Sequence, residues 1–291
     1  MPIIMQGNVF GTPKPLSLSA KNRFIAFIDI LGMKAWVNQD DPVQICQQIH
    51  YCLSEILKQA PNGEINGEKI GPLFGWFLFS DCLFLYTPDG SWASLHVLVS
   101  TSRMIVQRAL SIGIPMRGAV ALGKMVVDKN NSLIVGQPLV EAYEAESQKG
   151  YRGMGVQITS KTVTTITGML ESAEVPKAFS HEYTTALFRE RDTILSPDFI
   201  WFEDTLLINH WSAEYTAGVS LEPHISERID KFTNDFNKRG LPISTKILAQ
   251  SRDLLRFVNE NSSIVVVSFS HEGYFDSMQS ELFRINEIGI D

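Results

Sequence analysis

Two aspartates occur within or between apolar segments, where burial of an acidic side chain costs free energy. Asp29 lies inside the apolar run of residues 24–33, and Asp81 separates two further apolar runs, residues 73–79 and 83–86. A carboxylate in a buried strand needs a cation, either a basic side chain or a metal ion. Carboxylate oxygens suit Mg²⁺ and Mn²⁺. Two such ions about 3.5–4 Å apart can activate an attacking oxygen and stabilise a leaving phosphate. The pair therefore indicates phosphoryl-transfer chemistry.

Each aspartate also has a structural interpretation. Asp29 could pair with Arg117, and Asp81 could be an ordinary turn residue. A metal site explains both acids together, and neighbouring groups support it. Ile30 would add a backbone carbonyl, and Gly32 would let the following loop approach phosphates with its N–H groups. We therefore predict that both carboxylates bind metal.

Hydrophobic periodicity predicts the elements that must position these acids. Residues 23–30 read as a buried strand, and residues 73–79 and 83–86 read as a hairpin with Asp81 near its tip. Helices are predicted at 42–59, between Ser91 and Gly113, and at 138–148, 223–237 and 244–259; further strands are predicted at 116–121, within 123–136, and at 156–159, 198–211 and 263–269.

The order of these elements predicts an α/β sandwich with a mixed, largely antiparallel sheet covered by helices. We expect an irregular N-terminal arm at residues 1–19, one catalytic domain at residues 20–170, and a C-terminal extension at residues 171–291 packed on the same globule. No Pro-, Gly- or Ser-rich linker separates the last two.

Bulk properties exclude several classes of function. A formal net charge of −7 argues against a nucleic-acid partner held through phosphate contacts. No stretch approaches the roughly 20 apolar residues of a membrane span, and the first residues lack a signal-peptide pattern. Cys46, Cys52 and Cys82 have no metal-like spacing and read as buried free thiols. We expect a cytoplasmic protein without membrane contact.

Four motifs resemble those of class III nucleotidyl cyclases, in the order of that family. This resemblance covers residues 22–170. It implies a ferredoxin-like sandwich and a head-to-tail homodimer, in which each active site takes metal ligands from one chain and transition-state groups from the other. The motifs are the first metal motif at residues 27–33, the Ser80-Asp81 hairpin, the strand at residues 117–123, and the last helix and strand at residues 136–146 and 156–159.

The resemblance also implies roles for individual residues. Asp29 and Asp81, with the carbonyl of Ile30, would hold two Mn²⁺ or Mg²⁺ ions that bind a nucleoside triphosphate. The activated ribose 3′-hydroxyl would attack the α-phosphorus, form a 3′,5′-cyclic phosphate and expel pyrophosphate. Backbone N–H groups of Leu31, Gly32 and Met33 would contact the triphosphate.

Two departures concern the base. Phe77 stands where adenylate cyclases commonly have a base-reading lysine, and Leu133 stands where they have an acidic reader. Without those hydrogen bonds, ordinary purine selection is lost. The chain also resembles the pyrimidine cyclases of bacterial Pycsar antiphage systems, through the form Ile28-Asp29-Ile30-Leu31-Gly32, the Ser80-Asp81 hairpin, the Arg117-Gly118-Ala119 strand and the glutamate-rich last helix. Loss of both purine readers fits this resemblance. That branch implies synthesis of cyclic UMP or cyclic CMP from UTP or CTP, sensed by a separate effector, with Phe77 beside the smaller ring.

Two further departures concern the transition state. Val140 and Glu144 stand where the family has a helical asparagine and arginine. Another cation must then stabilise the phosphates, with Arg117 as first candidate and Lys124 and Lys34 as others.

Two alternatives stay open at this point. The chain could be a degenerate cyclase fold that binds nucleotides or dimerises without turnover, which Val140 and Glu144 favour. It could also be another two-metal phosphoryl enzyme, such as a nuclease or a diguanylate-type synthase. The negative charge opposes a nuclease, and the hairpin sequence Phe79-Ser80-Asp81-Cys82 lacks the synthase hallmark.

Overall fold

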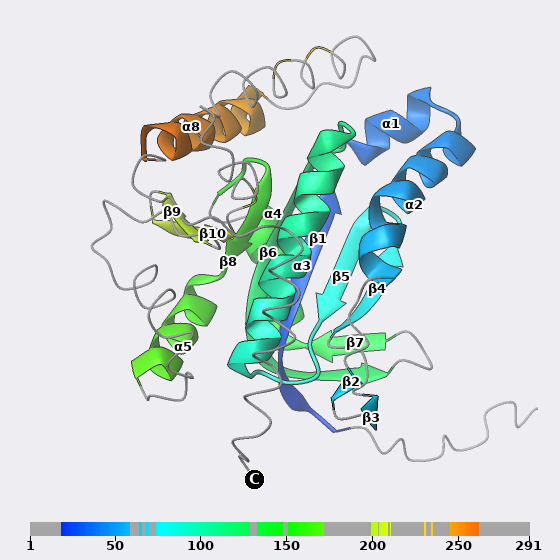
Figure 1. Ribbon diagram of the computed structural model, residues 1–291. Helices are drawn as coiled ribbons and strands as arrows, with labels where there is room; N and C mark the ends of the chain where they lie inside the picture. The colour runs from blue at the N-terminus through cyan, green and yellow to red at the C-terminus, as the bar shows by residue number, and fades with distance from the viewer. Residues whose placement is uncertain are drawn as a thin grey trace, which may run out of the picture.

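The computed structural model describes residues 19–58, 64–65, 68–69, 74–128, 133–147, 151–171, 199–202, 204–208, 210, 230, 234 and 245–261. Within these ranges (Figure 1), the elements are β1 (Lys21–Ile30), α1 (Met33–Gln39), α2 (Pro42–Lys58), β2 (Glu64–Ile65), β3 (Glu68–Lys69), β4 (Gly75–Phe79), β5 (Cys82–Tyr86), α3 (Trp92–Ser111), β6 (Met116–Asp128), β7 (Leu133–Gly136), α4 (Gln137–Ser147), β8 (Gly155–Ile158), α5 (Ser160–Glu171), β9 (Phe199–Phe202), β10 (Thr205–Ile208) and α8 (Thr245–Asn261).

One large sheet organises these elements. Its strand order is β4-β5-β1-β6-β8-β10-β9, and β7 pairs with β6 beside this path. β6 and β8 run parallel, whereas the other described pairs in the sheet are antiparallel. The predicted α/β class with a mixed, largely antiparallel sheet is confirmed. β1 lies between β5 and β6, so an apolar sequence suits both of its faces.

The two faces of β1 pack against different helices. Phe24 and Ile28 belong to the main core, to which α2 and α3 contribute residues such as Leu53 and Leu98. Ile25 and Phe27 alternate with them and pack on the opposite face of the sheet. Figure 1 shows α3 lying along β1 and β6. The opposite face is covered by α4 through Leu139, Ala142 and Ala145.

Several predicted boundaries are wrong for identifiable reasons. The expected single strand at residues 198–211 is a hairpin, because Thr205 pairs with Phe202 and the chain reverses between β9 and β10. The expected break after residue 121 is absent, since β6 continues as one strand to Asp128. The helices α1 and α5 were not among the predicted helices.

Strands β9 and β10, which fall within the expected C-terminal extension, belong to the same sheet, because β10 pairs with β8. The strand predicted at 263–269 and most of the helix predicted at 223–237 lie outside the described residues. Over the part of the chain that is described, no helix combines the length and apolar character needed to cross a bilayer.

Candidate metal and nucleotide site

The strand register places three candidate site residues in one row across the sheet. Asp29 of β1 lies opposite Cys82 of β5 on one side and opposite Arg117 of β6 on the other. Directly opposed residues in antiparallel strands share a face, so all three belong to the face that α4 covers. Gly118 allows close strand contact here, because a Cβ at that position would lie 2.3 Å from the carbonyl oxygen of Phe27.

A tight turn brings Asp81 to the same place. Phe79 pairs with Cys82, so Ser80 and Asp81 form a two-residue connection between β4 and β5. Ser80 has a φ of 56°, in the left-handed region that such turns require. The N–H of Ile30 donates to the carbonyl oxygen of Asp81 at 3.0 Å. This bond fastens the turn to the end of β1 and sets the two aspartates side by side.

The resulting cluster contains a residue that the sequence interpretation assigned no function. The potential ligand atoms of Asp29, Asp81 and Cys82 all lie within 4.8 Å of one another. The Cys82 thiol donates to Asp29 Oδ1 at 3.6 Å and to Asp81 Oδ1 at 3.7 Å. All three side chains are half-buried. Two carboxylates and a thiol are a donor set that fits a divalent metal ion.

Electrostatics at this cluster favour a cation. Burial, followed by the charges of Glu146 and Asp81, raises the pKa of Asp29 to about 6, against smaller opposing effects of Cys82 and Arg117. Burial and the two neighbouring carboxylates raise the pKa of Cys82 to about 12. These shifts show that negative charge is poorly compensated at the end of β1. A divalent ion would supply that compensation.

Arg117 is engaged elsewhere. Its Nε donates to Glu146 Oε1 at 2.7 Å, and a terminal nitrogen makes a second bond to the same oxygen. The other terminal nitrogen donates to the carbonyl of Arg152 at 3.4 Å. The side chains of Arg117 and Glu146 are only 15% and 5% exposed. The simple ion pair between Asp29 and Arg117 is therefore not what the structure shows, although the two lie directly opposite each other.

The loop after β1 corrects one predicted contact. The N–H of Leu31 donates to the carbonyl of Pro115 at 2.9 Å, so it is not available to a triphosphate. Gly32 adopts a left-handed φ of 81° and begins α1, with its carbonyl accepting from Ala35 and Trp36. The first N–H groups of a helix have no partner within it. Gly32 and Met33 therefore remain the candidate backbone contacts.

Two other predicted substrate contacts do not join this cluster within one chain. Lys124 lies opposite Asn22, seven residues along β1 from Asp29, or about 23 Å away, and on the other face of the sheet. Phe77 shares the face of Asp29, but it lies in the edge strand β4 and stacks on Tyr86 with ring centroids 5.6 Å apart. Lys124 therefore cannot contact a nucleotide held at the Asp29 cluster of its own chain.

Val140 and Glu144, the two departures from the family pattern on the last helix, both lie on α4. Val140 is 54% exposed on the outer side of α4. Glu144 lines a cavity of about 490 Å³ between α4, β8 and β10, together with Trp201 and Asp204. Lys161 closes part of this cavity by an ion pair with Glu141 at 2.6 Å. The abundance of carboxylates makes this cavity unsuitable for a triphosphate.

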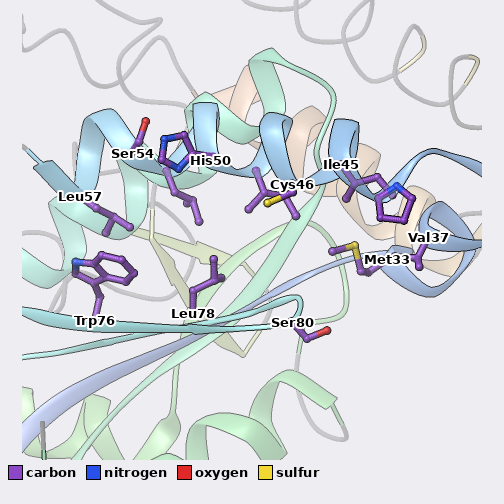
Figure 2. Close-up of a pocket in the computed structure, with 13 residues that line it drawn as sticks. Met33, Val37, Ile45, Cys46, His50, Ser54, Leu57, Trp76, Leu78 and Ser80 are labelled. Atoms are coloured by element: carbon purple, nitrogen blue, oxygen red, sulfur yellow. The ribbon is translucent and has the colours of Figure 1, made fainter. Parts of the chain in front are cut away.

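A second hollow lies behind the Ser80 turn, on the α2 side of the sheet. Figure 2 shows side chains of α1 and α2 on one side and of β4 on the other. The volume is about 480 Å³. Its lining contains no lysine, arginine or carboxylate, so it is not a triphosphate site either. The lining residues are Met33, Val37, Pro42, Ile45, Cys46, Ile49, His50, Leu53, Ser54, Leu57, Trp76, Leu78 and Ser80.

Comparison with known proteins finds partial likeness of fold. No protein-family model and no curated protein matches the chain. A bacterial light-regulated adenylyl cyclase matches 52% of this chain and 47% of its own, with a TM-score of 0.37 and 13% identity. This chain thus spans about half of that protein's length.

Two further solved structures give similar scores. The adenylyl cyclase CyaB from P. aeruginosa matches over 66% of this chain and 94% of its own, with a TM-score of 0.38 and 15% identity. A class III adenylyl cyclase-like ATP-binding protein from Pseudomonas aeruginosa matches over 52% and 36%, with a TM-score of 0.36 and 15% identity. Scores this low carry no function across, and the proposal below rests on the chain's own residues.

Proposed function

We propose that this protein is a metal-dependent nucleotidyl cyclase that converts UTP or CTP into the 3′,5′-cyclic monophosphate and pyrophosphate. One observation carries the proposal: Asp29 and Asp81, from separate strands, meet with Cys82 at the end of the central strand. Their charge is poorly compensated there, as the raised pKa of Asp29 indicates. Active sites are places where such arrangements concentrate.

The chain's own groups have separate roles in this proposal. Asp29 and Asp81 hold the metal, with the carbonyl of Ile30. Bound Mn²⁺ or Mg²⁺, two ions per site, supplies activation of the ribose hydroxyl and stabilisation of phosphate charge. The backbone of Gly32 and Met33 orients the triphosphate. The 3′-oxygen forms a bond to the α-phosphorus, the bond to the β-phosphate oxygen breaks, and the hydroxyl proton passes to solvent.

Arg117 is the proposed stabiliser of the charge that develops on the phosphates. It is nearly buried and lies opposite Asp29, whereas Lys34 is exposed on α1 and Lys124 lies at the far end of the sheet. Its present bond to Glu146 keeps the guanidinium at this end of the sheet. A planar guanidinium suits phosphate oxygens in two-point contacts.

The pyrimidine preference rests on the side chains at the base-reading positions. Phe77 offers a ring face and no hydrogen bond, and Leu133 is 48% exposed at the start of β7. Neither can recognise the amino group or ring nitrogens of a purine. A small ring packed on an aromatic side chain is the base that this chemistry favours.

We propose that two chains pair head to tail through the face on which α4 lies. Large apolar side chains are exposed in this region, and an apolar group of this kind marks an interaction surface. Pairing would also place Phe77 and α4 beside the metal cluster of the partner. The exposed side chains are Phe79 at 76%, Val140 at 54% and Tyr143 at 50%.

A charge on that face should separate the pair. Phe79→Glu is expected to give a monomer with little cyclase activity, because a desolvated carboxylate at an interface is costly. Val43→Glu is the matched control, since Val43 is also exposed, at 60%, but lies on α2. Sedimentation equilibrium measures the mass of each variant. The proposed interface would be contradicted if both variants form dimers, or if neither variant does.

The cyclase proposal is tested with purified protein, Mn²⁺ and each of the four ribonucleoside triphosphates. Mass spectrometry of the products should show a cyclic monophosphate and pyrophosphate from UTP or CTP. A cyclic purine product would support cyclase activity but contradict the preference for a pyrimidine. Intact triphosphates in all four reactions, with a dimer verified in the same sample, would overturn the proposal.

Specific observations favour one other function, a nucleotide-sensing or dimerisation module without turnover. Glu144 places an acid where a cation is needed, and Arg117 is held by Glu146. Such a module would bind a triphosphate without releasing pyrophosphate. Calorimetric binding combined with an absence of product would select it.

For the biological role, we propose a bacterial antiphage second messenger that acts through a separate effector in the cytoplasm. Its support is the sequence resemblance of the 27–33, 80–81 and 117–119 motifs to the pyrimidine cyclases of such systems. A rise in cyclic UMP or cyclic CMP after phage infection, absent in a strain carrying Asp81→Ala, is the expected result.

A further inference from the structure

Cys82 occupies a position that a site made only of carboxylates does not need. Its sulfur reaches Asp29 Oδ1 at 3.6 Å and Asp81 Oδ1 at 3.7 Å, so it touches both acids at once. The β1–β5 register holds it opposite Asp29, and it directly follows Asp81 in the chain. The thiol is therefore fixed by the same backbone that fixes the aspartates.

These separations match the spacing of ligands around a small tetrahedral ion. Zinc binds sulfur at about 2.3 Å and carboxylate oxygen at about 2.1 Å, which at a tetrahedral angle separates the two ligand atoms by about 3.6 Å. At the right angles of an octahedral ion with similar bond lengths the separation is about 3.1 Å. The sulfur–oxygen distances of 3.6 and 3.7 Å, which are also ordinary for thiol hydrogen bonds, fit the tetrahedral value, so such an ion needs little movement of these side chains.

Sulfur also changes which metal the site prefers. Mg²⁺ takes oxygen ligands, whereas a thiolate selects softer ions such as Zn²⁺ and Co²⁺. We propose that Cys82 is a third metal ligand and that it makes this site bind Zn²⁺ and Co²⁺ in preference to Mg²⁺. The thiol proton passes to solvent as the sulfur–metal bond forms. The inference rests on the metal site of the proposed cyclase but not on its turnover.

Cobalt provides a direct readout, because a cobalt–thiolate bond gives an intense near-ultraviolet charge-transfer band that cobalt–carboxylate bonds lack. The full chain is titrated with Co²⁺, and Zn²⁺ and Mg²⁺ affinities are measured by competition. Cys82→Ser is compared with Cys46→Ser. Cys46 is a free cysteine on α2 that was predicted to be buried but is exposed. Circular dichroism verifies that each variant is folded, and Cys82→Ala replaces Cys82→Ser if the serine variant is not.

The wild type and Cys46→Ser are expected to show the band. Cys82→Ser should lose it, and its Zn²⁺ affinity should fall by at least about tenfold, while Mg²⁺ affinity stays unchanged. A band that survives in Cys82→Ser, or the same Zn²⁺ preference in both proteins, would overturn the inference. Failure of the cyclase proposal gives a different result. A cobalt band without product from any triphosphate would support Cys82 as a metal ligand and reject cyclase activity.

Discussion

Asp29→Asn is expected to abolish product formation and, at the same time, to stabilise the metal-free protein at neutral pH. Loss of a metal-binding charge should lower the rate of cyclic nucleotide synthesis by about 10³-fold or more. The stabilisation follows because Asp29 is desolvated and lies near Glu146 and Asp81, so its ionised form is disfavoured in the fold. Pyrophosphate release and urea unfolding measure the two effects.

The pH dependence of this stabilisation has a definite sign. The pKa of Asp29 is about 6 in the fold, against an ordinary value of 3.8. Ionisation therefore costs stability as pH rises from about 4 to about 6, and the whole cost is present above that range. Asparagine removes it. We expect little difference from wild type at pH 4 and a gain of about 1–2 kcal/mol at pH 7.5, a figure reduced for solvent screening.

A matched control separates this effect from a general charge effect. Asp253 is exposed on α8, in an ion pair 3.8 Å from Arg256. Asp253→Asn should change stability by no more than about 0.5 kcal/mol at either pH and leave activity intact. If Asp29→Asn instead destabilises the protein at pH 7.5, Asp29 is a structural partner of Arg117 and the metal site loses its basis.

The second large effect is expected at Arg117. Arg117→Met leaves Glu146 buried without its cation, and breaking a buried ion pair in this way costs about 3–5 kcal/mol. Glu146→Gln should also destabilise the fold. The double variant should recover most of the loss, which a urea double-mutant cycle measures as a coupling of about 2 kcal/mol or more.

The Arg252–Asp230 pair is the control for this cycle. Its nitrogen–oxygen distance is 2.9 Å, but the two side chains are 50% and 59% exposed. Solvent screening limits such a pair to about 1 kcal/mol or less. The folded double variant of Arg117 and Glu146 should remain about 10²-fold less active, because the phosphate-stabilising cation is absent. Additive stability changes, or full activity of the double variant, would contradict the roles assigned to Arg117.

The aspartate pair could be predicted because its position depends on local patterns. An apolar run containing one acid identifies the central strand, and the short gap between the two following runs identifies the hairpin. Those two features bring Asp29 and Asp81 to one edge without any knowledge of packing. The burial of β1 on both of its faces is likewise readable from its continuous apolar sequence.

The remaining site residues depend on information that the sequence pattern does not contain. The proximity of Cys82 to the aspartates could be recognised only from the strand register, which places it opposite Asp29. Glu146 is 29 residues from Arg117, and their contact depends on how α4 packs on the sheet. Lys124 was proposed only as a substitute cation, and its position depends on the register of β6, which places it opposite Asn22 and far from Asp29. The N–H of Leu31 was predicted to contact the triphosphate, but it donates to the carbonyl of Pro115 instead.

Asp29, whose ionised form destabilises the native fold, also disfavours incorrect pairing of β1 during folding. If β1 slipped by one residue against β5 and β6, every side chain on it would change faces. Asp29 would then enter the apolar core beside α2 and α3, where an unpaired carboxylate costs far more than at its native, half-exposed position. The slipped form is thus disfavoured more than the native one is. The carboxylate of Asp29 therefore favours the observed strand alignment over the slipped one.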